Sequence, residues 1–289
     1  MISVIVPAYN EADAIQRSVE TIRDVLNRGG LTGAEIIVID DGSSDGTGNI
    51  ALEAGAIVVR QPHNLGYGSA LKAGIARATN DTIVIIDADL TYPVEAIPDL
   101  VARYREGFDM VVGARSGEHY RESIIKSPLR RLLKAMVEFT AERPVPDVNS
   151  GLRVFGKARV TEYLGHLCNT FSFTTSLTLA YMMTGRFVTY VPIAYTERVG
   201  QSKVRLFKDA VRTFQYVVQS MIYYNPLRMF ILMSVFCVLM AVASFAVGAL
   251  SDFNAPYYLG IGGLLMALLV FSIGLLADLL RQIMARGQR

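Results

Sequence analysis

Cysteine and histidine are scarce in this chain, and their scarcity excludes two common ways of stabilising a fold. Two cysteines in 289 residues cannot form the dense disulfide framework of a small secreted module. Cys237 lies inside an apolar run, which leaves Cys168 without a partner, so a reducing compartment fits the chain. The three histidines are scattered along the sequence, and no Cys/His cluster has the spacing of zinc ligands.

Charge of either sign is also in short supply. Charged residues make up 19% of the chain, against about 25% in ordinary soluble domains. The formal net charge of +2 gives no bulk electrostatic reason to expect a nucleic-acid partner. Residues 229–251 and 253–277 contain no charged residue, and each run exceeds the roughly 20 residues that a spanning helix needs. We therefore expect two transmembrane helices within 226–289.

The basic residues around these runs predict how they lie in a membrane. Basic side chains flank only the outer ends of the two runs: Arg228, Arg281, Arg286 and Arg289. By the positive-inside rule, both outer ends and the large domain before them face the cytoplasm. We expect a multi-pass protein of the cytoplasmic (inner) membrane with its C-terminus cytoplasmic. A buried hairpin in a soluble protein is the disfavoured alternative, and the strand-like start of the chain predicts no signal peptide.

Residues 1–205 alternate between apolar runs and helical patterns. Five strands are expected, at 2–7, 35–40, 56–59, 82–87 and 110–113. Helices are expected between them, at 11–28, 45–54 with Asp45 as its cap, 68–78 and 93–106. Beyond a basic, irregular region at 116–149, further strands are expected at 151–155 and 187–192, with a helix at 174–184. This order predicts an α/β domain with a mostly parallel sheet whose ligands bind at the carboxyl ends of its strands.

Residues 206–225 form a separate amphipathic segment. Apolar residues recur there at helical spacing, while Lys208, Arg212, Gln215 and Gln219 lie elsewhere on the helix. A helix of this kind just before a spanning segment is expected to lie in the membrane interface, and packing against the domain is the alternative. This helix and the spanning helices also offer surface for self-association, and the sequence leaves the oligomeric state open.

Polar residues follow four of the expected strands, and one pair of carboxylates stands out. Asp87 and Asp89 end a purely apolar strand, and Asp40 and Asp41 end another. Carboxylates crowded at strand ends are costly unless a cation meets them. A hard divalent ion, Mg²⁺ or Mn²⁺, that bridges substrate phosphates is the natural partner. A dinucleotide-binding oxidoreductase is disfavoured, because Leu71 replaces the third glycine after Gly66 and Gly68.

Five segments carry a more specific signal in combination than any of them does alone. They are Val6-Pro7-Ala8-Tyr9-Asn10-Glu11, Ile39-Asp40-Asp41-Gly42-Ser43, Asn64-Leu65-Gly66, Asp87-Ala88-Asp89 and Ser150-Gly151. Together they resemble the family-2 inverting glycosyltransferases with the Rossmann-like GT-A fold. The chain looks most like the polyprenyl-phosphate branch, the dolichol-phosphate mannose synthases and their bacterial undecaprenyl-phosphate relatives. The resemblance covers about residues 2–205, and two terminal spanning helices match the membrane-anchored members.

The resemblance implies roles for individual residues. The nucleoside of a GDP- or UDP-sugar donor is expected on Pro7, Tyr9, Glu11 and Asp41. The metal, and through it the donor diphosphate, is expected on Asp87 and Asp89, with Thr91 in the place of a third ligand. A loop that closes over phosphates is expected from Arg198, Ser202 and Lys203.

The same resemblance implies how the acceptor is bound. Arg115 and Arg131 are expected to hold the phosphate of a polyprenyl-phosphate acceptor, and Asp147 is expected near the sugar. With Asp89, these are the residues expected at the reaction itself. A phosphate monoester is already an anion at neutral pH, so the site needs to supply positioning and charge neutralisation rather than a strong base. Transfer of mannose or glucose with inversion is the leading expectation.

Three departures from the family pattern bear on the sugar and the metal. Thr91 stands where mannose synthases have glutamine, and Ala135 stands where related acceptor sites can offer a serine. The helix expected at 174–184 lacks the acidic residue of some members.

Three other functions are compatible with parts of the sequence. A diacylglycerol or other alcohol acceptor would require a catalytic base, for which Asp147 is the first candidate. Processive polysaccharide synthases carry a Gln-x-x-Arg-Trp motif, and this chain has no tryptophan. A nucleotide-binding membrane scaffold is the non-enzymatic alternative, and the intact Asp87 and Asp89 argue against it.

Overall fold

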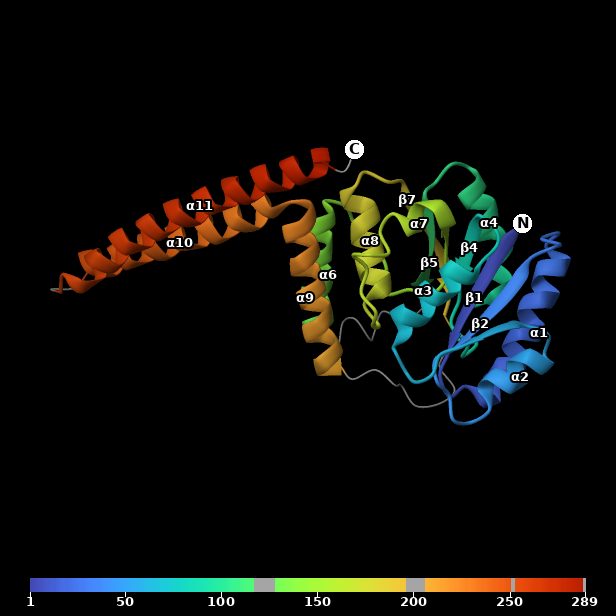
Figure 1. Cartoon of the computed structure of the whole chain (residues 1–289). Coiled ribbons are helices and arrows are strands. Elements are labelled where there is room, and N and C mark those ends of the chain that lie inside the picture. Colours follow the sequence, from blue (N-terminus) through green and yellow to red (C-terminus); the bar gives the residue numbers. More distant parts are fainter. Residues whose placement is uncertain (117–127, 196–205, 251–252, 288–289) are drawn as a thin grey trace. The chain divides into compact units, whose positions relative to one another are not determined.

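The computed structural model describes residues 1–116, 128–195, 206–250 and 253–287 (Figure 1). The chain divides into two compact units, Met1–Val217 and Val218–Arg289, which are described separately below. The boundary falls inside helix α9 (Leu206–Tyr224).

The first unit contains a seven-stranded sheet in the order β3-β2-β1-β4-β6-β5-β7. Its strands are β1 (Ile2–Ala8), β2 (Glu35–Asp40), β3 (Ile57–Arg60), β4 (Thr82–Ile85), β5 (Met110–Ser116), β6 (Arg153–Gly156) and β7 (Val188–Ala194). All neighbours pair in parallel except β6, which runs antiparallel to β4 and β5. The strands β1, β2, β4 and β5 therefore point the same way, and their carboxyl ends share one edge.

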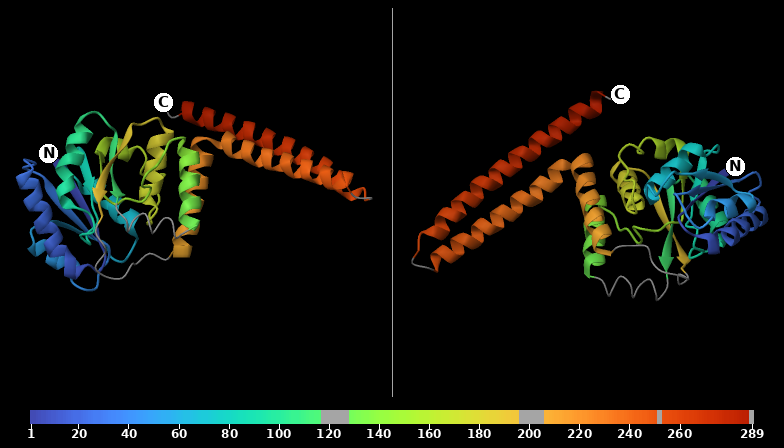
Figure 2. Two further views of the ribbon diagram at one scale, coloured as in Figure 1. Left: turned by 180° about the vertical axis from the view of Figure 1, so that it is seen from behind. Right: turned by 60° about the horizontal axis from the view of Figure 1, so that its bottom comes forward.

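Helices cover both faces of this sheet, which explains why its strands are apolar throughout (Figures 1 and 2). On one face lie α1 (Ala12–Arg28), α2 (Thr47–Glu53) and α4 (Ile97–Arg105), where Val4 and Val6 join their core. On the other lie α3 (Tyr67–Arg77) and α8 (Phe173–Met183). A Cβ added at Gly74 of α3 would collide with Ile5 of β1, so glycine lets this helix approach the sheet closely.

The short helices η1 (Val94–Ala96) and α7 (Lys157–Thr161), helix α6 (Pro128–Ala141) and the first part of α9 complete the first unit. Val137 of α6, Leu179 of α8 and Val217 of α9 belong to one buried apolar cluster. Ser172 and Thr213, both buried, share a hydrogen bond of 2.7 Å that ties α9 to the start of α8. The amphipathic helix therefore packs against the domain, while Val211 and Phe214 on it stay exposed.

The second unit is a helical hairpin of α10 (Pro226–Ala249) and α11 (Ala255–Gly287). Both helices are long and apolar enough to cross a membrane, with mean hydropathies of 2.6 and 2.4. Hydroxyls bind across the pair: Ser234 Oγ donates to the Ala267 carbonyl at 2.9 Å, and Ser244 Oγ to the Pro256 carbonyl at 2.7 Å. Hydrogen bonds from serine hydroxyls between helices are typical of helices packed in a bilayer.

The predicted α/β domain with a mostly parallel sheet is confirmed, and it is followed by two helices that are long and apolar enough to span a membrane. Local details differ. The strand expected from residue 151 begins at Arg153, and β4 ends at Ile85, before the acidic pair. Asp45 does not occupy the cap position of α2, which belongs to Gly46 with φ 88°. The Asp45 carboxylate instead accepts from the backbone N–H of Thr47 at 3.0 Å and of Ala12 at 3.1 Å, so it joins the starts of α1 and α2.

Candidate active site

The predicted site residues gather at the carboxyl edge of the sheet. Pro7, Tyr9 and Glu11 lie at the end of β1, and Asp41 directly follows β2. Asp87 and Asp89 follow β4, and Arg115 lies at the end of β5. Because these four strands are parallel, their ends bring the predicted nucleoside, metal and acceptor residues to one side of the domain.

The loops after β1 and β2 are locked together by side chain to backbone bonds. The backbone N–H of Asn10 donates to Ser43 Oγ at 3.0 Å, and that of Glu11 donates to Thr47 Oγ1 at 2.9 Å. Asn10 has a φ of 51°, a left-handed conformation that marks a strained and specified turn. Tyr9 is exposed beside it, with 37% of its surface accessible. This corner is rigid and carries an accessible aromatic ring, which suits a nucleoside.

Asp41 faces inward, not outward. Its two carboxylate oxygens accept from the backbone N–H groups of Leu65 at 2.8 Å and Gly66 at 2.9 Å, and only 4% of the residue is exposed. Burial raises the pKa of this carboxyl, although the two backbone bonds work against the rise. The aspartate therefore holds the loop before α3 in place.

The acidic pair is oriented by neighbouring hydroxyls. Tyr67 Oη donates to Asp87 Oδ1 at 2.9 Å. Asp89 Oδ1 accepts from the backbone N–H of Thr91 at 3.2 Å and from its Oγ1 at 2.6 Å. Leu90 between them has a φ of 57°, which is rare for a branched residue and indicates a backbone shaped for function.

The donor set of this pair fits a divalent metal. Two carboxylates, each with one oxygen fixed by a hydroxyl, offer the hard oxygen ligands that Mg²⁺ and Mn²⁺ prefer. Among the described residues no group of three His, Cys, Asp or Glu side chains could hold a metal alone. A divalent ion held here would therefore need further ligands from water or substrate, as is usual for Mg²⁺. Thr91 is buried, and its hydroxyl proton is directed at Asp89.

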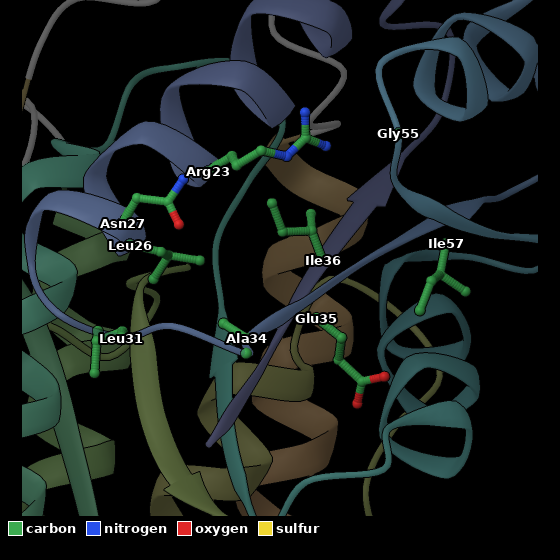
Figure 3. Close-up of a pocket in the computed structure, with 10 residues that line it drawn as sticks. Arg23, Leu26, Asn27, Leu31, Ala34, Glu35, Ile36, Gly55 and Ile57 are labelled. Carbon is green, nitrogen blue, oxygen red and sulfur yellow. The ribbon is translucent and has the colours of Figure 1, made fainter.

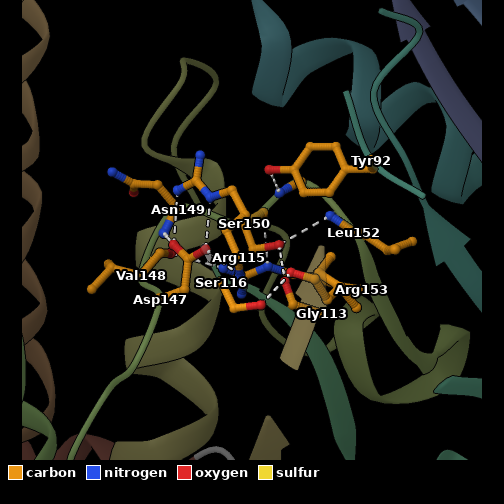
Figure 4. A network of polar contacts seen from close by, with 12 residues as sticks. Tyr92, Gly113, Arg115, Ser116, Asp147, Val148, Asn149, Ser150, Leu152 and Arg153 are labelled. Atoms are coloured by element: carbon orange, nitrogen blue, oxygen red, sulfur yellow. Dashed lines mark hydrogen bonds and ion pairs between the residues drawn. The ribbon is translucent and has the colours of Figure 1, made fainter. Parts of the chain in front are cut away.

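Arg115 and Asp147 form a bidentate ion pair. Arg115 Nε lies 2.7 Å from Asp147 Oδ2, and its Nη2 lies 2.8 Å from Oδ1 (Figure 4). The backbone N–H of Arg115 also donates to Oδ2 at 3.1 Å, and the Arg115 guanidinium lies over the Tyr195 ring at 5.3 Å. Asp147 is 1% exposed, whereas the Arg115 side chain is 18% exposed. The aspartate is thus committed to orienting the arginine.

The backbone of the turn 147–151 is hydrogen-bonded by Arg153, a residue that was not among the predicted site residues. Arg153 is fully buried, and its Nη2 and Nε donate to the carbonyls of Val148 and Ser150, each at 2.8 Å (Figure 4). Its Nη1 donates to Thr178 Oγ1 at 2.6 Å. Burial lowers the pKa of this guanidinium, which nevertheless stays a cation. The sequence feature that could have revealed this role is the single arginine within the otherwise apolar run 152–155.

The same turn reaches the acidic pair at its other end. The backbone N–H of Gly151 donates to Tyr92 Oη at 2.7 Å. A Cβ added at Gly151 would lie 2.5 Å from Asp87 Oδ2, so glycine allows the carboxylate to rest on the turn. One short turn thus lies against Asp87 and positions Arg115.

Arg131 is the remaining predicted residue that the structure describes. Arg131 is exposed on α6. Arg198, Ser202 and Lys203 lie outside the described residues.

A separate hollow of about 270 Å³ opens where α1 faces the start of β2 (Figure 3). Its lining includes Leu26, Leu31 and Ile36, and none of the predicted site residues. Arg23 at its rim already donates to the Ala54 carbonyl at 2.6 Å. It lies at the amino edge of the sheet, away from the candidate site.

Comparison with known proteins identifies the class. Residues 3–160 match the family model described as glycosyl transferase family 2, and the chain belongs to that family. Similar curated proteins are the undecaprenyl-phosphate 4-deoxy-4-formamido-L-arabinose transferases of Klebsiella pneumoniae and of Enterobacter sp. (strain 638). Each is 31% identical to this chain, over 260 and 259 residues respectively, with 86% of this chain and 75% of the relative covered.

Solved structures share the fold. Glucosyl-3-phosphoglycerate synthase from Mycobacterium tuberculosis, in complex with Mn²⁺, uridine diphosphate and phosphoglyceric acid, gives a TM-score of 0.63 at 24% identity, with 76% of this chain and 78% of that chain covered. The same enzyme with Mg²⁺ and uridine diphosphate gives 0.63 at 23% identity, with 76% and 79% covered. The expected GT-A fold is therefore confirmed.

Proposed function

We propose that this protein transfers a single sugar from a nucleotide-sugar to a polyprenyl phosphate, with inversion, at the face of a membrane. The observation that carries the proposal is the commitment of Asp147 to Arg115. The names of the curated relatives, which are undecaprenyl-phosphate transferases, support the same acceptor class.

The contacts of Asp147 favour a phosphate acceptor over an alcohol acceptor. An alcohol acceptor such as diacylglycerol must lose a proton, so it needs a base within hydrogen-bond reach. Both oxygens of Asp147 are occupied by Arg115, and Oδ1 also accepts from the backbone N–H of Asn149 at 3.2 Å. A buried carboxylate clamped in this way is a poor base. A phosphate acceptor needs none, and an oriented arginine is the group that it requires.

The reaction follows from these positions. An oxygen of the acceptor phosphate forms a bond to the anomeric carbon, while the bond from that carbon to the donor diphosphate breaks on the opposite face. The electron pair leaves with the nucleoside diphosphate, and no proton transfer is needed. Asp87 and Asp89 would hold the divalent ion, which neutralises the charge that develops on the departing diphosphate. Arg115 would orient the acceptor phosphate, with Asp147 fixing the arginine.

The other predicted residues would act around this centre, and the two backbone bonds to Asp41 change its proposed role from binding the nucleoside to holding a loop. The corner formed by Pro7, Tyr9 and Glu11 would bind the nucleoside, with Asp41 holding the adjoining loop. Thr91 would complete the metal site or orient Asp89. Arg131 would approach the lipid phosphate from α6, and the loop with Arg198, Ser202 and Lys203 would close over phosphates.

The membrane supplies the acceptor, and the first unit offers it an apolar surface. Leu132 and Phe139 on α6 are exposed, as are Val211 and Phe214 on α9. Exposed apolar side chains of this kind, with Arg131 next to Leu132 in the chain, suit a bilayer with anionic head groups. We place the first unit on the cytoplasmic face, with α10 and α11 spanning the bilayer.

The sugar itself is a separate question. Mannose or glucose is the expectation from the family resemblance, while the curated relatives are named for 4-deoxy-4-formamido-L-arabinose. We propose that all three belong in the donor panel.

The proposal is tested by nucleotide release from the detergent-purified full chain. GDP- and UDP-sugars are supplied with Mg²⁺ or Mn²⁺, and undecaprenyl phosphate is compared with diacylglycerol as acceptor. We expect release of nucleoside diphosphate that depends on undecaprenyl phosphate. Release with diacylglycerol alone would favour the second acceptor class, and tight nucleotide binding with no turnover would favour a scaffold.

A further inference from the structure

Asn149 occupies the midpoint of the turn that joins the two halves of the site. Two residues before it, Asp147 holds Arg115, and two residues after it, Gly151 supports Asp87. In the proposed reaction the transferred sugar lies between these two halves, because its anomeric carbon is bonded to the donor diphosphate and is attacked by the acceptor phosphate. A side chain at the midpoint of the turn is therefore placed beside the sugar.

The backbone of Asn149 is clamped on both sides. The carbonyls of Val148 and Ser150, its two neighbours, both accept from the buried guanidinium of Arg153 at 2.8 Å. The Asn149 backbone N–H donates to Asp147 Oδ1 at 3.2 Å. Two of the three nitrogens of a fully buried arginine thus bind this turn, which fixes the backbone position of Asn149.

The side chain of Asn149 is oriented as well. Thr175 Oγ1, from the start of α8, donates to Asn149 Oδ1 at 2.6 Å, and Thr175 is fully buried. With the oxygen engaged, the amide nitrogen has to point away from α8. In Figure 4 the side chain of Asn149 extends away from the network around Arg153. Of the five residues in the turn, Asn149 is the one with a polar side chain that is not buried.

We propose that Asn149 determines sugar specificity: its amide nitrogen donates to a hydroxyl or carbonyl oxygen of the transferred sugar. Thr175 and Arg153 are positioning residues that aim this amide. The inference rests on the proposed function only in requiring that the crevice binds a nucleotide-sugar. A preorganised donor discriminates between sugars, because a sugar that lacks the matching oxygen leaves the amide unpaired.

The test measures the affinity contributed by the sugar. Isothermal titration of the full chain in detergent with Mg²⁺ compares UDP with UDP-glucose and GDP with GDP-mannose. We expect Asn149→Ala to reduce the ratio of sugar-nucleotide to nucleotide affinity about 10-fold for the preferred donor, with the affinity for the nucleotide alone unchanged. Thr175→Val keeps the amide but releases its orientation, and we expect a smaller reduction in the same ratio. Asn27→Ala, an exposed asparagine on α1, is the matched control and should change neither value.

The outcomes separate this inference from the proposed function. If Asn149→Ala reduced the affinities for the nucleotide and for the sugar-nucleotide equally, Asn149 would have a merely structural role and the inference would be overturned. An unchanged ratio of the two affinities in both Asn149→Ala and Thr175→Val would overturn it as well. If Asn149→Ala does not fold, the Thr175→Val ratio decides. A wild-type chain that binds sugar-nucleotides but does not transfer to undecaprenyl phosphate would refute the proposed function and leave the binding ratio as a valid test.

Discussion

Replacing Gly151 with alanine should disable the site through one contact. The added Cβ would lie 2.5 Å from Asp87 Oδ2 and 2.7 Å from both Asp87 Cγ and Oδ1, with nothing nearer. Gly151 does not have a positive φ, so its backbone accommodates alanine. The change therefore acts on the carboxylate that is proposed to hold the metal.

The size of the effect follows from the geometry. Ordinary contact with a Cβ begins at 3.4 Å, so the Asp87 carboxylate has to retreat by about 0.9 Å. Its hydrogen bond to Tyr67 and the backbone after β4 resist that movement. A misplacement of about 1 Å in a catalytic constellation costs about 100-fold in rate. We expect kcat/KM to fall about 100-fold and the Mg²⁺ concentration for half-maximal rate to rise.

The assay is acceptor-dependent release of nucleoside diphosphate over a range of Mg²⁺ concentrations. Gly165→Ala is the matched control, because Gly165 is exposed and an added Cβ would meet nothing within 4 Å. Circular dichroism during heating checks that both variants fold. Wild-type turnover and metal dependence in a folded Gly151→Ala protein would refute the placement of Asp87 at the metal.

Four further predictions follow from other parts of the site and fold. Asp89→Ala should abolish transfer with the unfolding temperature unchanged, and undiminished turnover would contradict the metal assignment. Arg131→Ala should raise the KM for undecaprenyl phosphate but not the KM for the donor. Arg17→Ala, at another exposed arginine, is the control, and equal effects of the two variants would argue against a contact between Arg131 and the acceptor. Asp147→Asn should lower the free energy of unfolding by about 2 kcal/mol, because it weakens the ion pair with Arg115. It should leave the shape of the pH–rate profile unchanged, and loss of a pH-dependent limb would identify Asp147 as a catalytic base. Burial raises the pKa of Glu35, but hydrogen bonds from Ser3, Thr79 and Asn80 outweigh burial and hold that pKa below the ordinary 4.5. The stability that this carboxylate contributes is therefore present above pH 4.5 and is lost as the pH falls below it. Glu35→Gln should make the unfolding temperature less sensitive to acid in that range.

The sheet was predictable because its strands are buried on both faces and therefore read as continuous apolar runs. Residues 2–7 and 35–40 match β1 and β2 closely for this reason. The antiparallel insertion of β6 between β4 and β5 was not predictable, because it depends on pairing between segments about 40 to 70 residues apart and no local pattern encodes it.

The candidate site likewise contains residues that a local sequence pattern reveals and residues whose role depends on the fold. The acidic pair Asp87 and Asp89 was identified from its place after an apolar strand, a local signal. The ion pair of Arg115 with Asp147 joins residues 32 positions apart, and the sequence analysis gave these two residues unrelated roles. Arg153 has the residue type of a surface cation, and only the fold buries it. The geometry of the candidate site therefore depends on contacts that residue order alone does not specify.

The most direct test of the account compares undecaprenyl phosphate with undecaprenol, which lacks only the phosphate. Detergent-purified protein is incubated with Mg²⁺ and each nucleotide-sugar, and the lipid product is identified by mass spectrometry. The account predicts a glycosylated undecaprenyl phosphate, formed together with an equal amount of nucleoside diphosphate, and no product from undecaprenol. Equal glycosylation of the two lipids would contradict it, because the oriented Arg115 would then have no phosphate to recognise.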